Sequence, residues 1–60
     1  MSERYTVSVR EAPHMPLLYL VIDGRLQMDV YHWYGGFGKE QCDAVAKALN
    51  EVDDKHPDAW

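Results

Sequence analysis

The sequence predicts a small α+β domain in which a three-stranded antiparallel sheet carries one C-terminal helix on one face. Three observations support this class. Apolar and polar residues alternate over residues 4–10, a turn dipeptide interrupts the apolar run of residues 17–34, and the apolar period becomes helical from Lys39. A period of two is typical of strands, whereas spacings of three and four are typical of an amphipathic helix. We therefore expect residues 1–60 to form one domain.

The first predicted strand covers residues 4–10, where Tyr5, Val7 and Val9 alternate with polar side chains. Residues 11–16 contain two prolines that break regular pairing, so this segment is a predicted loop. The pattern does not decide whether the first strand pairs with the second or with the third.

The second and third predicted strands, residues 17–22 and 25–34, form a hairpin that turns at Asp23-Gly24. This type of dipeptide favours a two-residue turn because it tolerates positive φ angles. The turn sets three predicted pairs across the hairpin: Ile22 with Arg25, Leu20 with Gln27, and Leu18 with Asp29.

One face of this hairpin is uniformly apolar, and we expect the helix to cover it. Its members are Leu17, Tyr19, Val21, Leu26, Met28 and Val30. The predicted helix covers residues 39–54 and follows a glycine-rich link. Its apolar stripe consists of Cys42, Val45, Ala46, Leu49 and Val52. His56-Pro57 ends the helix, because a residue before proline is disfavoured in helical conformation, and residues 56–60 form a short tail.

The opposite face of the sheet also carries large apolar side chains, which one helix cannot cover. An apolar centre with aromatic anchors and a polar edge is typical of a protein interface. The predicted interface residues are Leu18, Leu20, Ile22, Arg25, Gln27, Asp29, Tyr31 and Trp33. A symmetric homodimer is the commonest assembly of a soluble chain. A heterologous protein partner, or cover by the tail with Trp60 as a plug, are the alternatives.

A chain this short gains little stability from its own core, and its single cysteine, Cys42, excludes an intrachain disulfide. Association is the remaining route to stability. The outline resembles small hairpin-plus-helix proteins of bacteriophages and prophages, and this resemblance implies an accessory or inhibitory role. We therefore expect a non-catalytic protein-interaction module that needs no cofactor.

Two other functions remain open at this stage. The glycine-rich segment before the helix could bind a small anion or a nucleotide through Gly36, Gly38 and Lys39, since a helix N-terminus attracts negative charge. Alternatively, the acidic helix face and tail could mimic a nucleic acid. The carboxylates of that surface are Glu40, Asp43, Glu51, Asp54 and Asp58.

Other functions are disfavoured. The net charge of −4 and the scattered basic residues argue against direct nucleic-acid binding. The longest apolar run, residues 17–22, is far shorter than the ~20 residues that span a bilayer. The N-terminus also lacks a signal-peptide pattern. We therefore expect a cytoplasmic protein. Cys42 and His32 are the only residues that could form a nucleophilic pair, and the spacing of cysteines and histidines does not indicate a metal site. We expect no enzyme.

Overall fold

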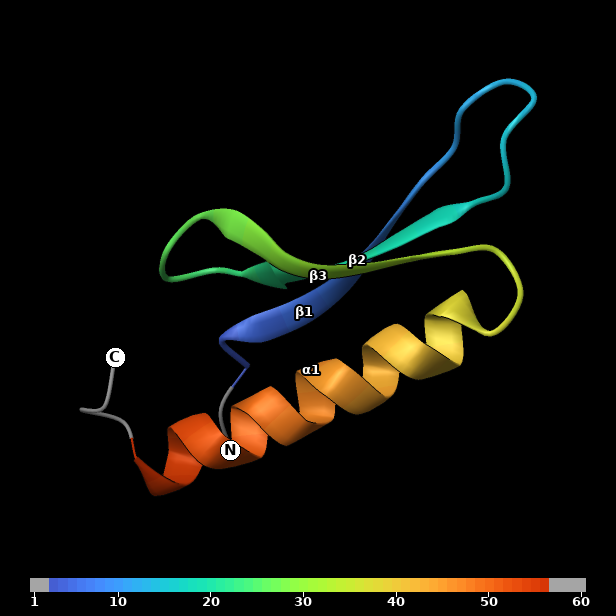
Figure 1. Ribbon diagram of the computed structural model, residues 1–60. Helices are drawn as coiled ribbons and strands as arrows, with labels where there is room; N and C mark the ends of the chain where they lie inside the picture. Colours follow the sequence, from blue (N-terminus) through green and yellow to red (C-terminus); the bar gives the residue numbers. More distant parts are fainter. Residues whose placement is uncertain (1–2, 57–60) are drawn as a thin grey trace.

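The computed structural model describes residues 3–56, which form three antiparallel strands and one C-terminal helix (Figure 1). Strands β1 (Tyr5–Arg10), β2 (Leu18–Asp23) and β3 (Met28–Tyr34) lie in that order in an open sheet, and α1 (Gly38–Lys55) packs against one sheet face. The predicted α+β class is confirmed. β1 pairs with β2, which decides the pairing that the sequence left open.

The loop between β2 and β3 is longer than the sequence predicts. It contains the four residues Gly24 to Gln27, so β3 begins at Met28 rather than at residue 25. The backbone N–H of Gln27 donates to the carbonyl oxygen of Asp23 at 2.8 Å, and Gln27 has a φ of 59°. Four-residue hairpin loops are a common alternative to two-residue turns.

The predicted pairing across this hairpin is therefore wrong. Leu18 lies opposite Tyr34, Leu20 opposite His32, and Ile22 opposite Asp29. The register also shifts between Val21 and Ile22, because Val30 is an extra residue in β3 that forms a β-bulge.

The bulge, and not the longer loop, changes which side chains face the helix. Before the bulge, Asp29 shares the open face with Ile22, as the sequence predicts. Beyond it every β3 side chain changes face, because side chains alternate with a period of two. Tyr31 now lies opposite Val21 on the helix side, and Trp33 lies there as well, opposite Tyr19. Their predicted position on the open face is wrong. His32 and Tyr34 occupy the open face instead, and their rings make an edge contact.

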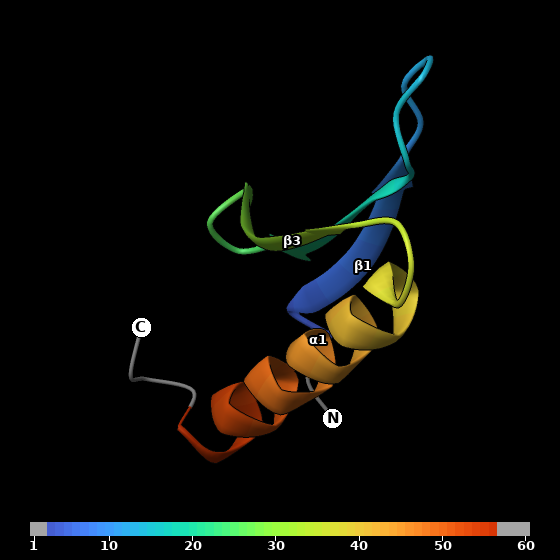
Figure 2. The same ribbon diagram turned by 45° about the vertical axis from the view of Figure 1, so that its right-hand side comes forward.

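The core lies between α1 and the helix-facing side of the sheet (Figure 2). Its buried members are Tyr5, Val21, Cys42 and Ala46, and five partly buried side chains pack around them: Val7, Tyr19, Tyr31, Val45 and Leu49. The helix contributes its smallest apolar residues to the centre. Its backbone can therefore approach the sheet closely.

Gly38 marks the point of closest approach at the start of α1. It is buried, and a Cβ built on its backbone would collide with the ring of Tyr19. Gly35 and Gly36 have a different role, since their φ angles of 56° and 45° lie in the left-handed region that glycine favours. The link between β3 and α1 thus requires glycine for two separate reasons.

We expect Gly38→Ala to destabilise the fold by about 1–3 kcal/mol, the usual cost of overpacking. Helix propensity alone predicts that this substitution stabilises the fold, because alanine is about 1 kcal/mol more favourable than glycine in a helix. Urea unfolding of both proteins measures the difference. In a Tyr19→Leu background the ring is absent, and the cost of the alanine should disappear. A stabilising Gly38→Ala substitution in the wild-type background would contradict this packing.

Candidate protein-interaction surface

A cluster of buried charges joins the sheet and the helix at one end of the molecule. Arg4, just before β1, donates from Nη2 and Nε to the two carboxylate oxygens of Asp23 at 2.8 and 2.9 Å. Its Nη1 donates to Oδ1 of Asp53 on α1 at 3.1 Å. The side chains of Arg4 and Asp23 are only 6% and 2% exposed. This cluster fixes the C-terminal half of the helix to the end of the sheet.

The same Asp23 carboxylate holds the β2–β3 loop. Its Oδ1 accepts hydrogen bonds from the backbone N–H groups of Arg25 at 2.9 Å and Leu26 at 3.1 Å, as an N-cap carboxylate does in the first turn of a helix. The ion pair with Arg4, and then these two N–H groups, lower the pKa of Asp23 to about 2. In return, the hydrogen bond to Asp23 raises the pKa of Arg4. Loop conformation and helix position therefore depend on one carboxylate.

The open sheet face exposes less apolar surface than the sequence suggests. Leu20, at its centre, is only 4% exposed, and Leu18 and Ile22 beside it are partly buried. Leu20 lies between Ser8 on β1 and His32 on β3. Of the other predicted interface residues, Asp29 shares this face, whereas Arg25 and Gln27 lie in the loop. The structure therefore divides the predicted set among the open face, the loop and the helix side.

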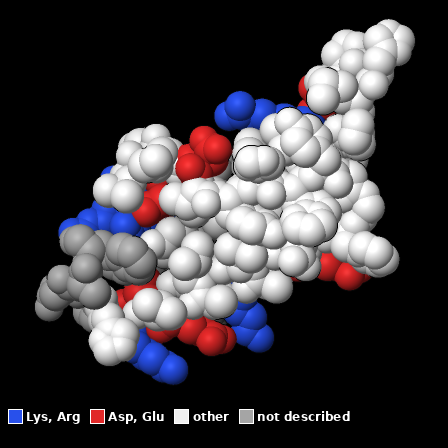
Figure 3. Space-filling model, viewed as in Figure 1, with Lys and Arg blue, Asp and Glu red and all other residues white. Residues whose placement is uncertain are grey.

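Exposed apolar side chains gather instead beside the helix, along β3. A cavity of about 330 Å³ opens there. Five apolar residues in its lining are Leu26, Val30, Tyr31, Val45 and Leu49. We call these five residues the β3–α1 margin and add Val52, which follows Leu49 by about one turn of α1. Leu26 is 57% exposed, and Val30 and Val52 are each 43% exposed. Figure 3 shows an uncharged area in the middle of the molecule, where Figure 1 places β3 and α1, with charged groups around its rim.

The sequence places Leu26 and Val30 on the apolar face that the helix was expected to cover, but that expectation is wrong for them, because both are exposed. The helical stripe did predict Val45, Leu49 and Val52 as one apolar face. A helix stripe indicates which side chains face the sheet, but it does not indicate how far the sheet extends beyond them. The available signal for a longer loop was Asp23 itself. An aspartate side chain can accept hydrogen bonds from the backbone N–H groups two and three residues later, here those of Arg25 and Leu26.

The predicted anion-binding residues have structural contacts in this fold. The backbone N–H of Gly38 donates to the carbonyl oxygen of Gly35 at 2.7 Å, and Gly36 adopts a left-handed conformation. Lys39 pairs with Asp43 at 3.3 Å on the exposed helix face. Anion binding stays a prediction that no contact in the described residues specifically favours.

Cys42 and His32 do not meet. Cys42 is fully buried in the core under the helix, whereas His32 lies on the opposite face of the sheet. Burial raises the pKa of the Cys42 thiol, and the negative charge of Asp43 raises it further. Both effects disfavour the thiolate. Within residues 3–56, no three histidine, cysteine or acidic side chains gather in a way that could hold a metal ion.

Comparison with known proteins finds no protein-family model, no curated protein and no solved structure that matches this chain. Among residues 3–56, no helix combines the length and the apolar character that crossing a membrane requires. Trp60 and Asp58, predicted as a plug and as part of an acidic surface, lie outside the described residues.

The pKa of Asp23 predicts a stability loss in acid. It is about 2 in the folded protein and 3.8 ordinarily, so the ionised carboxylate stabilises the fold fully above about pH 4. This contribution is lost as the pH falls through 2. We expect Tm, followed by circular dichroism, to drop across this window in the wild type.

Asp23→Asn should lower Tm at neutral pH and flatten the acid decline, because the titrating group is absent. Asp54→Asn removes an exposed carboxylate that makes no ion pair within residues 3–56, so it should keep the wild-type decline. An Asp23→Asn profile parallel to that of the wild type would contradict the role of this carboxylate.

Proposed function

We propose that this protein is a non-catalytic protein-interaction module that self-associates through the β3–α1 margin. The observation that carries the proposal is the exposure of Leu26 and Val30 at one mainly apolar cavity, whose single charged lining residue, Asp23, is buried and paired with Arg4. Isolated apolar side chains are normal on protein surfaces, but a contiguous group beside a cavity is typical of an interface.

The size of the exposed surface supports association. A chain of 7.0 kDa buries only about 60% of the surface that its unfolded form exposes. Its dimensions of 42 × 20 × 14 Å describe an elongated molecule with little interior. A partner that covers the margin would therefore supply burial that the chain lacks.

The uncharged character of the margin allows a second copy to be this partner. The net charge of −4 makes two copies repel each other in general. The side chains that define the margin are uncharged, so a two-fold interface could bring equivalent apolar side chains together without opposing like charges. A dimer of this kind could in turn bind or occlude another protein as an accessory or inhibitory factor. A cytoplasmic setting is part of the proposal, since a lone thiol suits a reducing compartment.

We expect the wild type to have twice the 7.0 kDa chain mass in light scattering after size exclusion, and to dissociate only on strong dilution. Val52→Lys should raise the dissociation constant at least tenfold, because it places a charge in the margin. Lysine suits the last turns of a helix, so the fold should persist by circular dichroism.

The matched control is Met15→Lys, which changes a still more exposed apolar residue in the β1–β2 loop, away from the margin. It should leave the mass unchanged. A monomeric wild type at high concentration, or equal dimerisation of Val52→Lys and Met15→Lys, would contradict the proposal.

A further inference from the structure

The outer edge of β1 has backbone groups that the sheet does not use. β1 is an edge strand, and Asn50 on α1 binds its first residue as a neighbouring strand would. The Asn50 carboxamide accepts a hydrogen bond from the N–H of Tyr5 and donates one to the carbonyl of Tyr5, both at 2.9 Å. Both backbone groups of Tyr5 therefore point away from β2.

The alternation of backbone groups along a strand then indicates which later residues of β1 also direct their N–H and C=O groups away from β2. In an antiparallel pair every second residue directs both backbone groups outward, so Val7 and Val9 share the orientation of Tyr5. Within residues 3–56, no hydrogen bond reaches these outward groups of Val7 or Val9. The edge is closed by Asn50 at one end and open along the rest of the strand.

A groove follows this open edge between β1 and α1. One hollow of about 610 Å³ contains Val7, Ala46 and Asn50 in its lining, and a second of about 400 Å³ continues past Val9. Both hollows share Val7 and Asp43, so the groove runs along the strand. It lies on the β1 side of the helix, whereas the β3–α1 margin lies on the β3 side.

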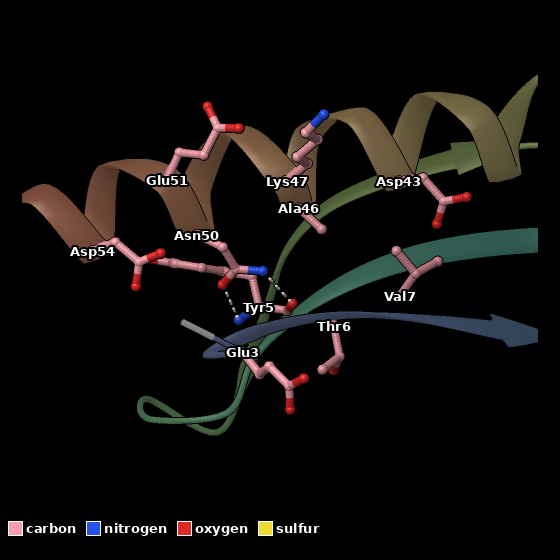
Figure 4. Close-up of a pocket in the computed structure, with 10 residues that line it drawn as sticks. All are labelled: Glu3, Tyr5, Thr6, Val7, Asp43, Ala46, Lys47, Asn50, Glu51 and Asp54. Atoms are coloured by element: carbon pink, nitrogen blue, oxygen red, sulfur yellow. Dashed lines mark hydrogen bonds between the residues drawn. The ribbon is translucent and has the colours of Figure 1, made fainter. Parts of the chain in front are cut away.

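The charges in this groove are mainly negative. Its first hollow is lined by four carboxylates and one lysine: Glu3, Asp43, Glu51, Asp54 and Lys47. Figure 4 shows Asp43 extending from the helix toward the Val7 part of β1, while Asp54 lies beyond Asn50 at the start of the strand, and Glu51 and Lys47 point away from the strand. Of the four carboxylates, Asp43 makes an ion pair, with the exposed Lys39, within the described residues. The groove therefore favours a cationic occupant.

We propose that the outer edge of β1 binds an extended peptide segment rich in lysine or arginine, which adds a fourth strand to the sheet. The peptide backbone pairs with Val7 and Val9, and its basic side chains approach Asp43, which lines both hollows beside these residues. Main-chain hydrogen bonds give affinity in this binding mode, and alternate side chains give specificity. A second copy of this chain fits poorly here, because two-fold pairing of β1 would bring the same carboxylates together.

The test uses fluorescence anisotropy with a labelled, capped seven-residue peptide of alternating lysine and valine. Two comparison peptides separate the contributions. One replaces lysine with glutamate, and the other carries an N-methyl group on every backbone nitrogen, so it cannot donate strand hydrogen bonds from either edge. We expect the lysine peptide to bind at least tenfold more tightly than either. Equal binding of the N-methylated peptide would overturn the strand-addition proposal, and equal binding of the glutamate peptide would overturn its charge preference.

Protein variants test the same contacts. Val9→Pro removes an outward N–H without removing a β1–β2 hydrogen bond, so it should weaken peptide binding at least tenfold, whereas Val9→Thr keeps the N–H and should bind normally. Asp43→Asn should weaken binding severalfold. Val52→Lys should bind the peptide as the wild type does, which separates this site from the self-association surface. No binding of the lysine peptide, or normal binding by a folded Val9→Pro variant, would overturn the proposal.

Discussion

The interaction on which the rest of the structure depends is the contact of the Arg4 guanidinium with Asp23 and Asp53. It joins the start of β1, the end of β2 and the last turns of α1 in one buried cluster. The apolar core is small, with four residues buried in its central cluster, so it constrains the helix direction weakly. A planar guanidinium that binds two carboxylates adds a directional constraint which apolar contacts cannot supply.

This cluster also explains why the surplus apolar surface lies beside the helix. Asp23 holds the loop in the conformation that leads into the bulge at Val30, and beyond the bulge Tyr31 and Trp33 face α1. A helix with its side chains is about 10–12 Å wide, whereas three strands occupy about 14 Å. α1 contacts all three strands, and apolar residues stay exposed on both outer strands, at Val9 of β1 and Val30 of β3.

The sequence was sufficient for the fold class because alternation in residues 4–10 and the helical stripe at Cys42, Val45 and Leu49 are local patterns. It was insufficient for the faces of β3. Asp23-Gly24 indicates a turn, but the length of that turn depends on hydrogen bonds from the Asp23 side chain, and its burial depends on Arg4, distant in the sequence. A bulge leaves no periodic signal, yet it exchanges the two faces of every later residue in the strand.

The surfaces on the two sides of α1 differ in chemistry for a reason visible in the helix. Residues Val45, Leu49 and Val52 turn toward β3, whereas Asp43, Asn50 and Asp54 lie on the β1 side. Side chains on the polar side can form hydrogen bonds with backbone groups, as Asn50 does with Tyr5, whereas those on the apolar side cannot. An apolar surface without hydrogen-bonding capacity suits a large, dry contact with a second copy. A polar groove beside unpaired backbone suits a narrow, extended ligand. The two proposed contacts thus differ in kind because the two sides of α1 differ in chemistry.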